Sequence, residues 1–177
     1  MSLKKHIITG GPCSGKTTTV QALKEKGFGI VEEASRILIE EQTRSGGDLV
    51  PWKKLHEFNV AVTELQVKLE AEAKDGTHFL DRGVVDNLAY CEWGGIKPPE
   101  NLQAAVKDST YHKVFLLQQL NHFENDEVRK ESPEDAVRLQ GLVKKAYESQ
   151  GYQVIEVPPW PVEKRVEFIL GHVSVSE

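Results

Sequence analysis

The stretch that decides the fold is Gly10-Gly11-Pro12-Cys13-Ser14-Gly15-Lys16-Thr17. It fits the pattern Gly-x-x-x-x-Gly-Lys-Ser/Thr, in which glycines let successive backbone N–H groups face one concavity. A helix that starts at Gly15 would add its free N–H groups and the positive end of its dipole. We therefore predict a P-loop that binds a nucleoside triphosphate through Gly10, Gly11, Pro12, Cys13, Ser14, Gly15, Lys16, Thr17 and Thr18.

The surroundings of this stretch favour the P-loop over a chance glycine-rich turn with a solvent-facing lysine. The apolar run 6–9 before it is typical of a buried strand, and residues 15–26 after it have a helical pattern. Lys16 would place a full charge beside the β- and γ-phosphates, and Thr17 would offer a hydroxyl to Mg²⁺. Cys13 is interpreted as a small loop residue and not as a nucleophile, because no histidine partner stands near it.

The rest of the chain alternates short apolar runs with helical patterns. Such runs, apolar on both faces, indicate a mostly parallel sheet covered by helices on each side, in one domain over residues 1–177. Ligands of these folds bind beyond the carboxyl ends of the strands. We expect strands at 6–9, 28–31, 77–80, 113–117 and 152–157, and helices at 15–26, 34–43, 51–74, 84–92, 100–107, 132–150 and 162–170.

Acidic and basic side chains stand at two of these strand ends. Asp81 follows run 77–80, and we expect it to hold Mg²⁺ together with Thr17 and to act in catalysis; the alternative is a cap for the next helix. Arg82 is expected to bind a phosphate or a substrate hydroxyl, although an isolated arginine is more often a surface residue.

The second strand end carries Glu32 and Glu33, with Arg36 one turn later. One of the two carboxylates could act as general base for a substrate hydroxyl, and all three residues are candidates for substrate binding. The alternative is that acidic residues here only favour the dipole of the following helix. The sequence does not choose between the two glutamates.

Segment 119–138, between the fourth strand and a helix, is polar and highly charged. It is a candidate lid in which Arg129 would stabilise the transferred phosphoryl group, and a solvated charge run is the alternative. Arg138 is a weaker candidate because it falls in the expected helix. Trp52, Trp93 and Trp160 are expected to be packing residues.

Composition excludes several classes of protein. The 177 residues carry a net charge of −5 and 2 cysteines, which gives neither a basic face for nucleic acid nor a disulfide framework or zinc site. No apolar run approaches the roughly 20 residues of a membrane span, and no signal peptide is recognised. The expected location is the cytoplasm, with no nucleic-acid or membrane partner.

The P-loop, Glu-Glu-Ala-x-Arg at 32–36, Asp-Arg-Gly at 81–83 and Arg-Lys-Glu at 129–131 occur in an order that resembles the NadR-like AAA-domain family of ATPases and kinases. The chain is more distantly similar to nucleoside and nucleotide kinases. The resemblance implies a three-layer P-loop sandwich with strand order 2-3-1-4-5 and a lid after strand 4. By the same resemblance, Asp81 and Arg82 would face the acceptor, and Glu32 or Glu33 would act as base.

The expected function is an ATP–Mg²⁺-dependent phosphotransferase for a small nucleoside-, nucleotide- or vitamin-like acceptor. ATP is expected over GTP, because the Asn/Thr-Lys-x-Asp motif of GTPases is absent from the sequence. The alternative is a nucleoside-triphosphate hydrolase or a nucleotide-gated binding protein without such an acceptor.

Overall fold

Five parallel strands form one sheet in the order β2-β3-β1-β4-β5 in the computed structural model, which describes residues 2–120 and 132–174. The predicted α/β fold class and strand order are confirmed. The strands are β1 (Leu3–Thr9), β2 (Gly29–Val31), β3 (Gly76–Asp81), β4 (Lys113–Leu117) and β5 (Val154–Val157). The helices are α1 (Lys16–Glu25), α2 (Ala34–Ser45), α3 (Leu55–Ala71), α4 (Asp86–Trp93), α5 (Glu100–Asp108), α6 (Pro133–Ser149) and α7 (Val162–Ser174).

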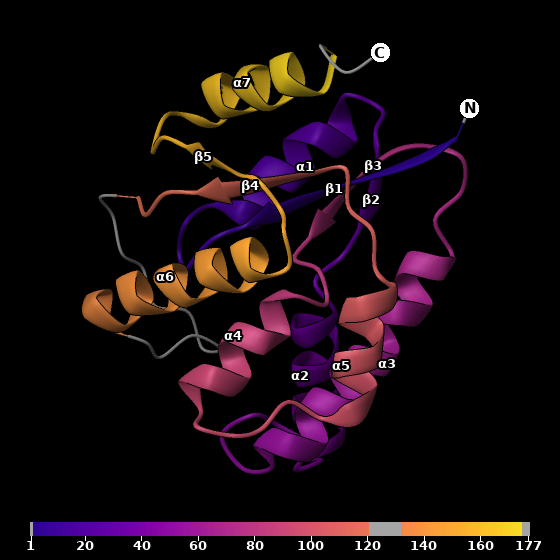
Figure 1. Ribbon diagram of the computed structural model, residues 1–177, viewed down its shortest axis with the longest axis vertical. Coiled ribbons are helices and arrows are strands. Elements are labelled where there is room, and N and C mark those ends of the chain that lie inside the picture. Colours follow the sequence, from indigo (N-terminus) through magenta and orange to yellow (C-terminus); the bar gives the residue numbers. More distant parts are fainter. Residues whose placement is uncertain (1, 121–131, 175–177) are drawn as a thin grey trace.

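Helices cover both faces of the sheet (Figure 1). Neighbouring residues of each strand point to opposite faces, so each central strand supplies both hydrophobic cores. Helices α1 and α7 lie on one face, and α4, α5 and α6 lie on the other. The first core contains Ile8, Phe79, Phe115, Leu23 and Ile169, and the second contains Ile7, Leu80, Leu116, Leu102 and Tyr147.

A third cluster joins α2 to α3 beside the carboxyl ends of the strands. Leu38 and Ile39 of α2 pack there against Phe58 and Val62 of α3. Since all five strands are parallel, their carboxyl ends meet at one edge of the sheet. The P-loop after β1, the acids after β2 and Asp81 at the end of β3 are therefore gathered at that edge.

Helix α3 starts later than the sequence predicted. The expected start at Pro51 is wrong, because residues 50–53 form a turn in which Val50 O accepts from the N–H groups of Lys53 and Lys54. Lys54 then has φ −136° and ψ 65°, which interrupts the helical geometry before Leu55. The turn leaves Pro51 and Trp52 at the mouth of a pocket described below.

Helix α6 begins as its sequence predicts. Ser132 accepts a hydrogen bond from the backbone N–H of Asp135 at 3.1 Å, and Pro133 takes the first helical position. In the parts of the chain that the structure describes, no helix combines the length and the apolar character that crossing a bilayer requires.

Candidate active site

The predicted P-loop is a tight turn between β1 and α1. Gly10 has φ 152° and Gly15 has φ 79°, a region that glycine enters without a steric penalty. Cys13, with φ 57°, also has a left-handed backbone conformation, which is uncommon for a residue with a side chain. The loop therefore has the backbone conformations that a phosphate-binding concavity requires.

The P-loop is held from several sides by segments far along the chain. A Cβ atom on Gly11 would lie 2.6 Å from the carbonyl oxygen of Ala136 in α6, so no larger residue fits there. The side chain of Gln119 donates to Pro12 O at 2.7 Å. These contacts tie the loop to the segment after β4 and to α6, two elements that the sequence motif does not include.

Lys16 lies within its own loop. Its Nζ donates to Gly11 O at 2.8 Å and approaches Ser14 Oγ at 3.4 Å, and the residue is only 2% exposed. The ammonium is therefore positioned beside the backbone that the motif predicts to surround phosphates. Thr17 and Thr18, which follow it at the start of α1, are both exposed.

Thr17 and Asp81, the two residues that the sequence predicted to hold Mg²⁺, lie within hydrogen-bonding distance of one another. Thr17 Oγ1 donates to Asp81 Oδ2 at 3.3 Å, and Asp81 Oδ1 is buried without a hydrogen-bond partner. Burial, followed by repulsion from Glu33, raises the pKa of Asp81 to about 6 despite Lys16 and Arg82 nearby. The alternative role as a helix cap is wrong, because Asp81 ends β3 and α4 begins only at Asp86.

A divalent cation fits this pair. An unsatisfied buried carboxylate oxygen beside a hydroxyl is the oxygen donor set that Mg²⁺ prefers, with phosphates and water completing its shell. Among the described residues there is no group of three or more His, Cys, Asp or Glu that could hold a metal by itself. An ion held by Thr17 and Asp81 would need oxygens from outside this pair to complete its shell.

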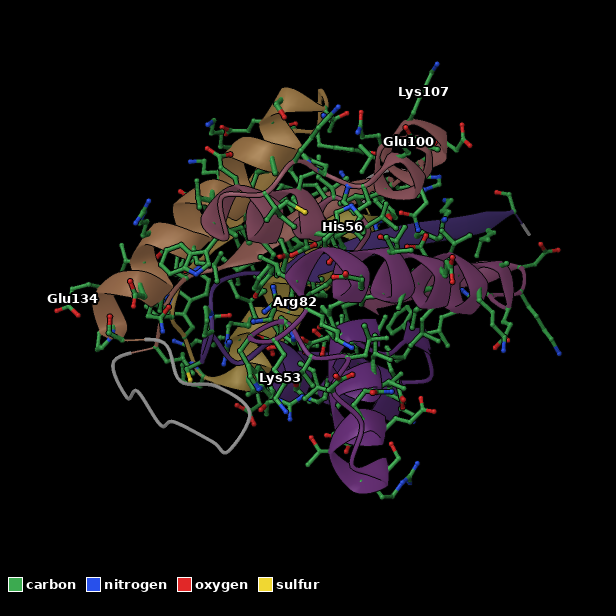
Figure 2. All side chains as sticks on the ribbon, turned by 90° about the horizontal axis from the view of Figure 1, so that it is seen from below. Lys53, His56, Arg82, Glu100, Lys107 and Glu134 are labelled. Atoms are coloured by element: carbon green, nitrogen blue, oxygen red, sulfur yellow. The ribbon has the colours of Figure 1, made fainter. Side chains whose placement is uncertain are left out.

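Arg82 links the two strand ends. Its Nε lies 3.2 Å from Glu33 Oε1 and its NH1 lies 3.4 Å from Asp86 Oδ1, while its guanidinium lies over the ring of Tyr90 at 5.2 Å. The alternative of a surface arginine is wrong, since Arg82 is 7% exposed and lies in the interior of the molecule (Figure 2). Its φ of 72° shows that the backbone is strained to aim this side chain.

Asp86 is a fully buried carboxylate that fixes Arg82. It also accepts hydrogen bonds from the hydroxyls of Thr9 and Tyr147 and from the backbone N–H of Gly83 at 3.0 Å. These donors come from β1, α6 and the turn after β3. A carboxylate with this many donors holds the guanidinium in one orientation.

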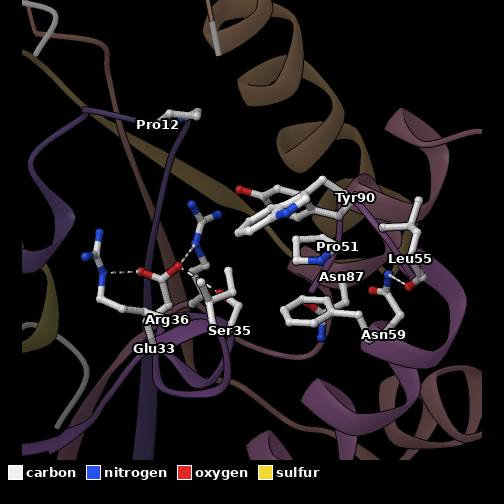
Figure 3. A pocket seen from close by; sticks show the side chains of 13 residues that line it. Pro12, Glu33, Ser35, Arg36, Pro51, Leu55, Asn59, Asn87 and Tyr90 are labelled. Carbon is white, nitrogen blue, oxygen red and sulfur yellow. Dashed lines mark hydrogen bonds and ion pairs between the residues drawn. The ribbon is translucent and has the colours of Figure 1, made fainter. Parts of the chain in front are cut away.

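A pocket opens beside the P-loop, and Pro12 lines it on that side. Figure 3 shows Glu33 and Arg36 at one end and Leu55 and Asn59 at the other, with Tyr90 above the middle. The remaining lining residues are Ser35, Ile39, Pro51, Trp52, Phe58, Arg82 and Asn87. The pocket thus combines one charged end with an aromatic and apolar end.

The two adjacent glutamates differ in exposure and in their contact with this pocket. Glu33 lines the pocket, accepts from Ser35 Oγ at 2.9 Å and has a side chain only 11% exposed. Glu32 is exposed and lies outside that pocket. Arg36 lies 4.0 Å from Glu33 and 3.7 Å from Glu40, so its charge is shared between two carboxylates.

Other candidates are placed differently or lie outside the described residues. Arg129 falls within 121–131 and is not described, so the candidate lid stays a prediction. Arg138 lies in α6 with its guanidinium over the ring of Trp93 at 5.0 Å. The expectation that Trp52 is a packing residue is wrong, since it is 58% exposed at the mouth of the pocket.

A family model described as an AAA domain matches residues 5–165. The chain belongs to this AAA-domain family. The resemblance to NadR-like members that the motifs indicated is thereby confirmed. None of the curated proteins matches the sequence significantly.

Solved structures that resemble this AAA-domain protein include a thymidylate kinase and NadR. Thymidylate kinase from Ehrlichia chaffeensis superimposes with a TM-score of 0.67 over 98% of this chain and 99% of its own, at 15% identity. NadR in complex with NR gives 0.66 over 87% of this chain, at 17% identity, and NadR with NAD and AMP-PNP gives 0.69 over 96%, at 16% identity. This chain spans only 43% and 48% of those two NadR chains. At these identities the likeness shows a P-loop kinase fold.

Two parts of the site in this AAA-domain protein were missed in the sequence. Asp86 stands four residues after Arg82, a spacing that could have indicated the pair, but nothing local indicates its bond to Tyr147. Tyr90, Phe58 and Asn59 fall within expected helices, where no motif distinguishes them. They belong to the site because α3 and α4 pack beside the P-loop.

Proposed function

We propose that the chain is an ATP- and Mg²⁺-dependent phosphotransferase that acts on a small nucleoside-, nucleotide- or vitamin-like acceptor. The observation that carries this proposal is that the pocket lies directly beside the P-loop. Pro12 of the loop lines this pocket, and Glu33 and Arg82 lie at its charged end. A hydrolase needs a phosphate cradle and a water molecule. A partly aromatic pocket next to the cradle suits a second small molecule instead.

At the nucleotide end, the backbone from Gly10 to Thr18 would bind the triphosphate. Lys16 would shift its ammonium from Gly11 O to the β- and γ-phosphates and neutralise charge on the transferred group. Thr17 and Asp81 would hold Mg²⁺ through their oxygens. When bound, that ion supplies charge neutralisation and orientation of the phosphates.

At the acceptor end, Glu33 would take the proton of the acceptor hydroxyl. The acceptor oxygen then forms a bond to the γ-phosphorus while the bond from that phosphorus to the β,γ-bridging oxygen breaks, and ADP leaves with the electron pair. Arg82 pairs with Asp86 and stacks on Tyr90, and it would orient both Glu33 and the acceptor for this transfer. Glu33 is preferred over Glu32 because only Glu33 lines the pocket.

The residues at the opposite end of the pocket indicate the chemistry of the rest of the acceptor. Phe58, Tyr90 and Trp52 offer aromatic surface, and Asn59 and Asn87 add amide groups that can bond polar edges. A planar ring attached to a hydroxyl-bearing group would fill such a pocket. The NadR structure that contains NR and the thymidylate kinase neighbour support an acceptor of this general type.

The test is a nucleotide-consumption assay with a panel of acceptors. The protein is incubated with ATP–Mg²⁺ alone and with nucleosides, nucleotides, and pyridine or vitamin ribosides, and ADP release is measured. The proposal expects a clear rise in rate with one class of acceptor and a phosphorylated product of matching mass. A rate that no acceptor changes would instead favour the hydrolase or nucleotide-gated alternative.

Trp52 should report acceptor binding directly. An acceptor ring that covers the exposed indole should change its fluorescence in a saturable manner, and Trp52→Phe should remove most of that change. Because a stacked aromatic pair contributes about 0.5–1.5 kcal/mol, Trp52→Ala should raise the acceptor KM by about 2- to 10-fold with little change in kcat.

Trp160 provides the matched control. It is 40% exposed, and its ring contacts Phe168 in α7, outside the pocket. Trp160→Phe should retain the acceptor-dependent signal. If that variant loses the signal while Trp52→Phe keeps it, the acceptor binds elsewhere.

A further inference from the structure

Arg165 reaches the P-loop from α7, far away in the sequence. Its NH1 donates to the carbonyl oxygen of Ser14 at 2.9 Å, and the residue is 3% exposed. The sequence motif gives no indication of this contact, which joins residues 151 positions apart. The last helix therefore supports the loop that the first helix opens.

The bond to Ser14 O fixes the direction of the next N–H group. The carbonyl of Ser14 and the N–H of Gly15 belong to one peptide plane, and no cis peptide bond occurs in the described residues. In a trans peptide these two groups point in opposite directions. Holding the carbonyl toward α7 therefore turns the Gly15 N–H away from α7.

The peptide on the other side of Gly15 is fixed as well. Gly15 O accepts from the backbone N–H of Thr19 at 3.1 Å and from Thr19 Oγ1 at 2.9 Å. Both peptide planes that flank this glycine are thus held by named partners. Glycine alone would rotate freely here, because it lacks the side chain that restricts the backbone.

Gly15 and Arg165 also fit one another sterically. A Cβ atom on Gly15 would lie 2.7 Å and 2.9 Å from the two terminal nitrogens of the guanidinium. The glycine is therefore required both by its left-handed φ and by the close approach of Arg165.

The charge of Arg165 is not balanced by a carboxylate within the described residues. No ion pair involving it occurs there, and its Nε is buried without a hydrogen-bond partner. Burial lowers the pKa of this guanidinium, the direction expected for a cation withdrawn from water. A buried cation is costly when no carboxylate among the described residues balances it, and an anion bound in the adjacent loop would offset that cost.

We propose that Arg165 is a positioning residue for nucleotide binding, which holds the Ser14–Gly15 peptide so that the Gly15 N–H faces the bound phosphates. The inference rests on the proposed function only in that the P-loop binds a nucleoside triphosphate. Acceptor binding is independent of it, because Arg165 does not line the acceptor pocket.

The experiment measures ATP–Mg²⁺ binding by calorimetry for the wild type and for Arg165→Met. Loss of a charge-assisted hydrogen bond and of loop order should raise the Kd for ATP about 10- to 100-fold. The kcat at saturating ATP and the acceptor KM should change by no more than about 2-fold. Arg165→Lys, which keeps the charge and one donor, should give an intermediate Kd.

Lys164→Met is the matched control, because Lys164 is the exposed neighbour on the same helix. It should bind ATP like the wild type. If Arg165→Met lowers only the thermal midpoint and leaves the Kd for ATP unchanged, the positioning role is overturned while the proposed function stands. A wild type that binds no ATP would overturn both, and if Arg165→Met does not fold, a wild-type Kd in Arg165→Lys overturns the inference.

Discussion

Replacing Lys16 by methionine should lower ATP-dependent turnover about 100- to 1000-fold and leave the fold intact. The ammonium is the one full positive charge that the P-loop itself carries, and in phosphoryl transfer catalysis depends on such electrostatic stabilisation. Methionine has a stem of similar length and is well tolerated in buried positions. Steady-state kinetics with the best acceptor of the panel gives the activity, and thermal unfolding checks the fold.

Lys24 provides the control for this substitution. It lies two turns later in α1, is exposed and occupies the last turn of the helix. Lys24→Met removes the same charge from the same helix, and its turnover should stay within about 2-fold of the wild type, since exposed charges contribute little. Full activity in Lys16→Met would contradict the assignment of the P-loop lysine.

The sequence indicated those parts of the candidate site whose residues lie close together along the chain or at the ends of predicted strands. The glycines, Lys16 and Thr17 lie within one short motif, and strand periodicity placed Asp81 at a strand end beside it. Because a parallel sheet brings its carboxyl ends to one edge, the meeting of Thr17 and Asp81 followed from the fold class.

The rest of the site depends on contacts between distant segments, which no local pattern records. No motif or spacing in the sequence distinguishes Arg165 from the other charged residues of its helix, or Tyr147 from the other aromatic residues of the chain. Arg165 reaches Ser14 because α7 packs on one face of the sheet, and Tyr147 reaches Asp86 because α6 packs on the other face. The start of α3 was missed for a related reason, since the turn around Pro51 is part of the pocket mouth.

Asp86, Arg82 and Glu33 form a chain of alternating charges from the core to the pocket. Asp86 is fully buried, Arg82 is nearly so, and Glu33 has a partly exposed side chain that faces the cavity. Arg82 therefore connects the buried carboxylate of Asp86 to the carboxylate of Glu33, and Arg36 lies 4.0 Å from Glu33 on its more exposed side. This arrangement fits a base that must be oriented and still reach a substrate.

Asp81→Asn should make the metal-free protein more stable at neutral pH while it lowers turnover about 100-fold or more. The pKa of Asp81 is raised from its ordinary value of 3.8 to about 6, so the folded state favours the protonated carboxyl. That contribution to stability is fully present below pH 3.8 and is lost as the pH rises through about 6. The difference corresponds to at most about 3 kcal/mol of unfolding free energy above that range.

Thermal and denaturant unfolding of both proteins with EDTA, from pH 4 to 7.5, would measure this effect. The stability advantage of Asp81→Asn should be absent near pH 4 and grow toward pH 7, whereas Asp75→Asn, which changes an exposed aspartate just before β3, should show no such trend. With Mg²⁺ and ATP added, the wild type should become more stable than Asp81→Asn. Only the wild-type carboxylate gains an ion partner that offsets the cost of its burial. A pH-independent difference would show that the fold does not raise the pKa of Asp81. A variant that gains as much stability from Mg²⁺ and ATP as the wild type would show that Asp81 does not bind the metal.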